Sequence, residues 1–200
     1  MKLYAVLYLL LSFSVFLHGQ TKKVEITSKI KAKVPEAFYR MTDADVVRQY
    51  GVLNIPLAIF SHPNNKVRFS VTRRIDTLGT SDPIQYQSGA NSDSYYLDQK
   101  MEASFMKSNL QAVYDSIYMI RDTIITIDKR DLIILEFEGF STQKGQTGNL
   151  VDVGTYSILA YHITENKRYL FNFHCPLRYR ADWQSTGREV IETLNFRGKL

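Results

Sequence analysis

The chain has 200 residues, 44% of them hydrophobic and 12% aromatic, and 25 basic side chains against 20 acidic ones give it a net charge of +5. This composition can bury a core, which excludes a disordered chain, and so small a basic excess is typical of a solvated surface rather than of a nucleic-acid-binding protein. The lone cysteine, Cys175, excludes an intramolecular disulfide, a CxxC redox motif and a cysteine-based zinc site.

The first residues have the pattern of a secretory signal peptide. Lys2 precedes an apolar run that ends at Leu17, and a polar segment begins after Gly19. The run is shorter than the roughly 20 residues of a membrane-spanning helix, so we expect cleavage after Gly19 and no stable membrane anchor afterwards. The remaining 24 basic and 20 acidic side chains give a net charge of +4. Residues 1–19 are therefore predicted to be a signal peptide, and residues 20–200 to form a single periplasmic or secreted domain.

The next 30 residues predict a strand followed by a short helix. Residues 24–34 alternate weakly and end at Pro35, which indicates one strand. Thr42 and Asp45 have the spacing of a capping box, and Gly51 can end the helix that begins there. Its inner face is expected to hold three residues, which are Val46, Val47 and Tyr50.

A hairpin and a longer helix follow. Residues 57–61 and 66–73 flank a four-residue turn, and pairing Ser61 with Lys66 places Ala58, Phe60, Val67 and Phe69 on one face. Residues 78–93 are rich in glycine, serine and aspartate, which predicts a loop. The next segment, residues 94–111, has a helical apolar stripe that is expected to face the core. This stripe consists of Leu97, Met101 and Phe105, with Met106 and Leu110 beside them.

Two more hairpins are predicted in the second half. The first joins residues 114–127 to 132–139, and pairing Asp128 with Asp131 places Arg121 opposite Glu138 as an ion pair. The second joins residues 153–163 to 168–175 around a turn at 164–167.

The register of this last hairpin separates His174 from Cys175, because neighbouring strand residues point to opposite faces. Cys175 is assigned to an apolar core face and His174 to a mixed face half covered by a helix, so the two are not expected to form a reactive pair. The residues assigned to the core face are Tyr156, Ile158, Ala160, His162, Tyr169, Phe171, Phe173 and Cys175.

The C-terminal segment predicts a helix over residues 181–194 and a short extended piece at 195–197. The helical stripe consists of Trp183, Gly187, Val190, Ile191 and Leu194. Hairpins with flanking helices favour an antiparallel α+β sandwich.

Catalytic signatures are absent from the sequence. His62, His162 and His174 lack HxH or HExxH spacing, there is no GxSxG elbow, and Glu138 is explained by Arg121. We therefore predict no catalytic residue, no cofactor and no metal site. The polar loop over residues 141–152 is the candidate partner-contact site, through Gln143, Lys144, Gln146 and Asn149.

The order of these elements, the hairpin "PLAIFSHPNNKVRFSV" and the closing run "YSILAYHITENKRYLFNFHCP", then "DW" and "VIETLNF", resemble the PsbP-like superfamily. That superfamily includes DcrB-type bacterial envelope proteins. The resemblance implies an antiparallel sheet sandwiched by helices (α/β/α), and a role in binding or assembly without enzymatic chemistry.

We therefore expect a non-enzymatic exported accessory protein that contacts an envelope protein and no nucleic acid. Two alternatives remain open. One is a small-ligand carrier that holds a lipid or a metal between sheet and helix, suggested by the aromatic residues of the last hairpin. The other is a hydrolase that uses Glu136 or His174.

Overall fold

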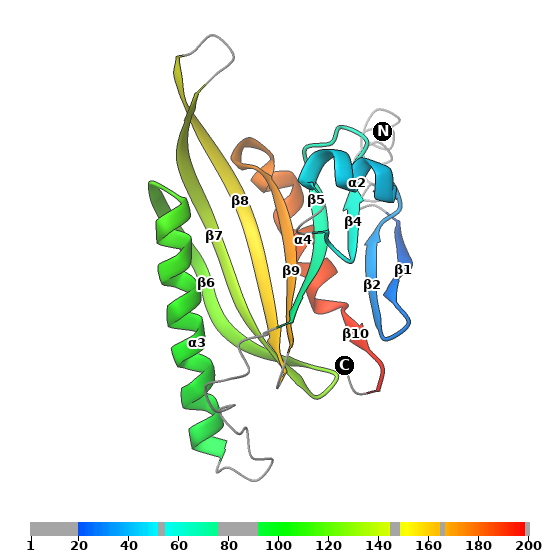
Figure 1. Cartoon of the computed structure of the whole chain (residues 1–200), viewed down its shortest axis with the longest axis vertical. Coiled ribbons are helices and arrows are strands. Elements are labelled where there is room, and N and C mark those ends of the chain that lie inside the picture. Colours follow the sequence, from blue (N-terminus) through cyan, green and yellow to red (C-terminus); the bar gives the residue numbers. More distant parts are fainter. Residues whose placement is uncertain (1–19, 52–54, 76–91, 145–148, 165–166, 199–200) are drawn as a thin grey trace, which may run out of the picture.

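The computed structural model describes residues 20–51, 55–75, 92–144, 149–164 and 167–198, arranged as two antiparallel sheets with helices packed against them (Figure 1). The larger sheet has seven strands in the order β3-β4-β5-β9-β8-β7-β6, and the smaller has the order β1-β2-β10. This arrangement confirms the predicted antiparallel α+β fold. The predicted signal peptide lies outside the described residues, and no helix among those described is long and apolar enough to span a membrane.

The N-terminal segment forms two strands instead of the predicted one. β1 (Thr21–Thr27) and β2 (Ile30–Pro35) form a hairpin, and β10 (Asn195–Phe196) pairs with the other edge of β2. The turn allows Ile26 on β1 and Ile30 on β2 to be buried together. The weak alternation of the sequence therefore continues through two strands that share one buried face.

The first helix, α2 (Asp43–Tyr50), is capped as predicted. The Thr42 hydroxyl accepts a hydrogen bond from the Asp45 amide at 3.2 Å, and Gly51 has the positive φ of 72° that favours glycine. Of the expected inner face only Val46 is buried, while Val47 and Tyr50 are exposed. The hydroxyl of exposed Tyr50 accepts a hydrogen bond from Arg68 at 2.9 Å.

The hairpin of β4 (Ala58–Ser61) and β5 (Arg68–Ile75) has its predicted faces but not its predicted register. Ser61 pairs with Arg68 instead of Lys66, because Asn65 adopts a positive φ of 56° and the connection is longer. A shift of two residues preserves the faces of a strand. Ala58, Phe60 and Phe69 are therefore all buried, as expected. β3 (Tyr39–Arg40) pairs with the free edge of β4.

The hairpin of β6 (Ser116–Ile127) and β7 (Arg130–Lys144) turns within two residues, Asp128 and Lys129, both with positive φ. The turn lies one residue earlier than predicted, with Ile127 paired to Arg130, and this shift places Arg121 opposite Glu136. The Arg121 guanidinium contacts Glu192 at 3.2 Å instead, so the predicted Arg121–Glu138 pair is wrong.

The last hairpin has the predicted register. In β8 (Leu150–Ile163) and β9 (Lys167–Pro176), Tyr156 pairs with Cys175 and His162 with Tyr169. The η2 turn (Leu177–Tyr179) then leads into α4 (Arg180–Glu192), which packs on the same face as Cys175. Its predicted stripe is confirmed, with Gly187, Val190 and Ile191 buried and Trp183 packed against the core.

The opposite face of the large sheet is covered at its β6–β8 side by α3 (Ser92–Val113), which runs alongside β6 and β7 (Figure 1). Ala103, Met106 and partly buried Leu110 make this contact. Met101 and Phe105 are 66% and 58% exposed, so their predicted core position is wrong. Ala103, Met106 and Leu110 lie on one face of the helix, three and four residues apart, and this face packs on the sheet. Met101 and Phe105 lie on an adjacent face of the helix, beside the contact.

Candidate functional site

Cys175 and His174 do not form a reactive pair, as the sequence predicts. Cys175 is fully buried, and this burial raises the pKa of its thiol to about 12, so the thiol stays protonated. His174 is on the opposite face, where burial and then the charge of Arg68 lower its pKa to about 4. A neutral imidazole and a protonated thiol on opposite faces of a strand cannot act as base and nucleophile.

Cys175 is accordingly expected to resist thiol reagents in the folded protein. A thiol with a pKa of about 12 has roughly 10³-fold less thiolate at pH 8 than an unperturbed cysteine, and the core also shields it. Labelling with a chromogenic disulfide at pH 8 should be negligible in buffer and reach one thiol per chain in urea. Rapid labelling of the native protein would contradict the assigned position of Cys175.

The other two histidines within the described residues, His62 and His162, serve packing. His162 approaches the rings of Tyr169 and Phe196, and its Nδ1 lies 3.1 Å from the Asp131 carbonyl oxygen. Burial lowers the pKa of His162. His62 lies against Phe38 and Trp183. No group of three or more metal-ligating side chains occurs within the described ranges.

Glu136, which the hydrolase alternative names, is fully buried. Two hydrogen bonds of 2.9 Å join the Arg188 guanidinium to its two oxygens, and Gln184 and the Tyr156 hydroxyl donate to it at 2.7 and 2.8 Å. Burial by itself would raise the pKa of Glu136, but the bonds from Arg188, Tyr156 and Gln184 outweigh it and lower the pKa. This carboxylate holds α4 on the sheet.

The predicted partner-contact loop is largely a pair of strands. We define the arm as residues 141–144 of β7 and 150–153 of β8, which pair from Ser141–Val153 to Lys144–Leu150. The pairing of β6 with β7 stops at Phe140, and that of β9 with β8 stops at Thr155. The arm therefore has two open edges among the described strands, and Figure 1 shows it projecting beyond its neighbours.

Of the four predicted contact residues, Gln143 and Lys144 lie on β7, Asn149 directly precedes β8, and Gln146 lies outside the described residues. The sequence reading missed Leu150 and Val151, which are 71% and 42% exposed. As strand neighbours they point to opposite faces of the arm. The apolar, β-forming pair at the end of a polar segment was the signal that could have identified them.

The base of the arm is braced by Asp115, at the junction between α3 and β6. Its carboxylate accepts a hydrogen bond of 2.6 Å from the Thr142 amide, and its own amide donates to the Phe140 carbonyl at 2.9 Å. Within the arm the Thr142 hydroxyl donates to Asp152 at 3.2 Å. The arm thus presents its apolar side chains from a supported base, as an interaction surface requires.

Neither a protein-family model nor a curated protein matches the chain. Among solved structures, it is similar to cyanobacterial PsbP (CyanoP) from Synechocystis sp. PCC 6803, with 14% identity, a TM-score of 0.53, and coverage of 90% of this chain and 94% of that one. It is also similar to a point mutant of the protein Mog1, with 11% identity, a TM-score of 0.52, and coverage of 88% and 96%.

These likenesses define the fold class as an antiparallel α+β sandwich with helices on both faces of the sheet. The fold is the PsbP-like fold, which confirms the fold that the resemblance found in the sequence implied. The narrower relationship to DcrB-type envelope proteins stays a prediction.

Proposed function

We propose that this protein is a non-enzymatic accessory protein, exported to the bacterial envelope, that binds a protein partner there through the arm. The observation that carries the proposal is the arm itself, which combines open strand edges with exposed Leu150 and Val151. Open edges bind an added strand through main-chain hydrogen bonds, and exposed apolar side chains supply affinity.

The PsbP-like fold is compatible with such a role. The chemistry of the described residues supports it as well. The oxygens of Glu136 are occupied by Arg188, Gln184 and Tyr156, and His174 is a neutral, largely buried imidazole. A hydrolase that uses either residue gains no support from this geometry.

The alternative of a small-ligand carrier is favoured by no specific contact. Four of the aromatic residues that suggested it, Tyr156, Tyr169, Phe171 and Phe173, belong to the packed core on the α4 side of the sheet. Export is proposed from the predicted signal peptide, and a mature protein that begins at Gln20 in mass spectrometry would support it.

The decisive test is the double substitution Leu150→Asp and Val151→Asp in tagged protein that is crosslinked in its native envelope. We expect the main enriched partner to fall by at least about tenfold, because charged side chains cannot be buried unpaired at an interface. The melting temperature should not change, since both residues are exposed.

The matched control is Met101→Asp, which places a charge on a similarly exposed apolar side chain of α3, away from the arm. It should leave capture of the partner unchanged. The proposal is wrong if the wild type enriches no envelope protein, or if the arm variant captures the partner as well as the wild type does.

A further inference from the structure

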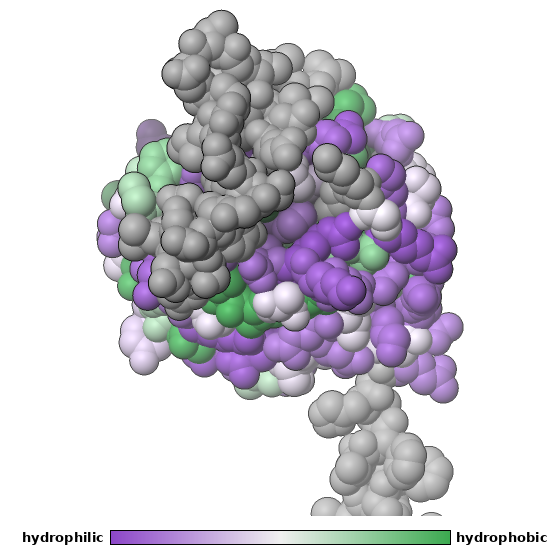
Figure 2. All heavy atoms as spheres, turned by 90° about the horizontal axis from the view of Figure 1, so that it is seen from below, coloured by the Kyte–Doolittle hydropathy of each residue, from purple (hydrophilic) through white to green (hydrophobic). Residues whose placement is uncertain are grey.

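A hollow of about 350 Å³ lies between the outer face of the β1–β2 hairpin, the end of α4 and the turn that joins β6 to β7. Its polar lining consists of Lys23, Lys31, Lys33, Asp128, Glu192, Thr193 and Asn195. Lys31 and Lys33 alternate with the buried Ile30, Ala32 and Val34 of β2, so they project from its outer face. Lys23 pairs with Lys33 and therefore projects from the same face. The side of the molecule where β1 and β2 lie, at the right of Figures 1 and 2, is largely hydrophilic.

Only one of the three lysines that line the hollow has a negatively charged partner among the described residues. Lys31 pairs with Glu25 across the strands and contacts its carboxylate at 2.9 Å. Lys23 stands directly opposite Lys33, and neither forms an ion pair with any described residue. Like charges directly opposite each other in an antiparallel pair are destabilising. The hollow thus keeps two uncompensated ammonium groups side by side at a cost in stability.

The acidic side chains of the wall do not provide the missing charge. The Asp128 carboxylate accepts hydrogen bonds from the Asn195 amide group at 2.7 Å and from the Phe196 backbone amide at 3.0 Å. Glu192 accepts from Arg121 at 3.2 Å. These bonds engage each carboxylate with another partner, and neither forms an ion pair with Lys23 or Lys33.

The nearby end of α4 does not account for the lysines either. Cations near a helix C-terminus interact favourably with its exposed carbonyl groups. Here the Glu189 carbonyl accepts from the Thr193 amide at 2.9 Å, and the Ile191 carbonyl from the Leu194 amide at 3.2 Å. The Thr193 hydroxyl donates to the Val190 carbonyl at 3.3 Å. Three of the last four carbonyls of α4 are therefore already hydrogen-bonded within the chain.

We propose that this hollow binds a phosphate group, held between Lys23 and Lys33. A phosphate carries up to two negative charges near neutral pH, which matches the two uncompensated ammonium groups, and lysine binds it as a point charge. The phosphate belongs to a soluble phosphate compound or to a phospholipid headgroup. This site is distinct from the arm, and it adds an anionic ligand to the proposed protein partner.

The first experiment measures melting of the purified protein in inorganic phosphate and in chloride at equal ionic strength. Phosphate at ten times its dissociation constant should raise the melting temperature by about 3–6 °C. The double variant Lys23→Gln with Lys33→Gln should lose this shift. Without phosphate it should melt no lower than the wild type, because the substitutions remove the repulsion between the lysines.

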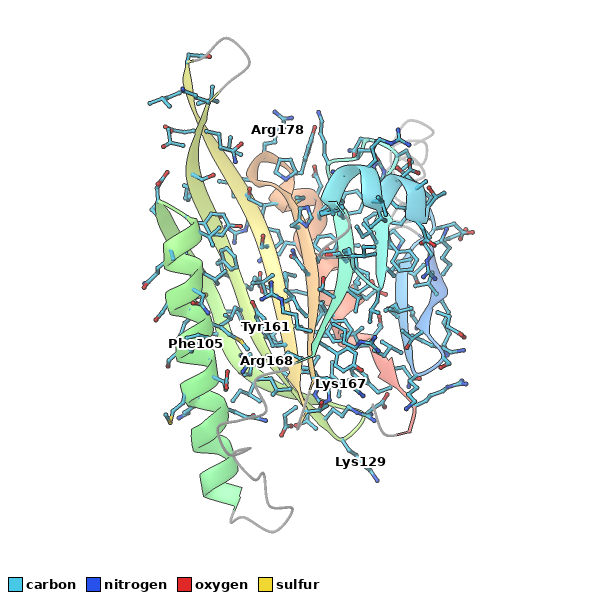
Figure 3. The ribbon with its side chains drawn as sticks, in the orientation of Figure 1. Phe105, Lys129, Tyr161, Lys167, Arg168 and Arg178 are labelled. Carbon is cyan, nitrogen blue, oxygen red and sulfur yellow. The ribbon has the colours of Figure 1, made fainter. Side chains whose placement is uncertain are left out.

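The control is Lys129→Gln, since Lys129 is exposed and points away from the body at the β6–β7 turn (Figure 3). It should keep the full shift. A second experiment compares sedimentation with vesicles of neutral phosphatidylcholine and with vesicles that contain anionic phosphatidylglycerol. Stabilisation by free phosphate assigns a soluble ligand, whereas binding to the anionic vesicles alone, lost in the double variant, assigns a headgroup.

Three results would overturn the proposal. One is binding of neither phosphate nor anionic vesicles by the wild type. Another is an equal loss in Lys129→Gln and in the double variant, which would indicate unspecific attraction. The third is a double variant that melts below the wild type without phosphate, which would give the lysines a structural role. Since none of these experiments involves the arm, their outcome is separate from that of the partner capture.

Discussion

Replacement of Arg188 by alanine is expected to lower the free energy of unfolding by about 3–5 kcal/mol. The substitution removes two charge-assisted hydrogen bonds from Glu136, whose side chain is fully buried between the sheet and α4. Gln184 and Tyr156 remain as neutral donors, but they cannot compensate the charge. A buried carboxylate without its cation is among the costliest defects in a core. Equilibrium unfolding in urea at pH 7 measures the loss.

The same substitution should reverse the pH dependence of Glu136. In the wild type the folded-state pKa of Glu136 is lowered, so its contribution is present at neutral pH and is lost as the pH falls through that value. Without Arg188, burial raises the pKa instead, and the variant regains stability as acid protonates the carboxyl group. The difference between wild type and variant should therefore shrink between pH 7 and about pH 4.

A control for this prediction is Arg48→Ala. Arg48 contacts Asp45 at 2.8 Å, but its side chain is 78% exposed. Exposed ion pairs contribute little, so this change should cost no more than about 0.5 kcal/mol. If Arg188→Ala cost no more than Arg48→Ala, the ion pair of half-exposed Arg188 with buried Glu136 would not anchor α4.

The sequence predicted which face of the sheet each strand residue occupies better than it predicted which residues of neighbouring strands pair. The residues of the last hairpin were assigned correctly because a strand alternates with period two, and the turn at Thr164 had the expected length. The two earlier hairpins kept their faces but shifted by two residues. Their turns depend on positive φ at Asn65, Asp128 and Lys129, and none of these has the glycine that signals such a conformation.

Contacts between residues that are far apart in the sequence could not be predicted. The row of α3 that faces the sheet depends on where the helix lies, so Met101 and Phe105 could not be distinguished from Met106 by periodicity. Glu136 stands in an apolar strand, but Arg188 lies 52 residues further along the chain, and no local pattern links the two. For the candidate site, the polar segment was identified, whereas its strand character and its apolar side chains Leu150 and Val151 were not.

The second large effect is expected at Gly187, in the middle of α4, where alanine should destabilise the protein by about 1–3 kcal/mol. Helix propensity alone predicts the opposite, because alanine is favoured over glycine by about 1 kcal/mol in a helix interior. Whether Gly187→Ala stabilises or destabilises the protein depends on the room available for the added β-carbon. A β-carbon on Gly187 would lie 2.6 and 2.8 Å from two ring carbons of Phe173 and 3.0 Å from the Ile158 Cδ1 atom.

Neither neighbour can yield easily, since Phe173 and Ile158 are fully buried in the core beneath α4. The helix must therefore move away from β9, and the movement also weakens the contact of Arg188 with Glu136. Ser185→Ala, at an exposed position of the same helix, should raise stability by a few tenths of a kcal/mol. Adding Phe173→Leu to Gly187→Ala should cost less than the two separate losses combined, because the smaller side chain frees the space that the new methyl group needs. If Gly187→Ala stabilised the protein as Ser185→Ala does, α4 would not approach the sheet as closely as the structure shows.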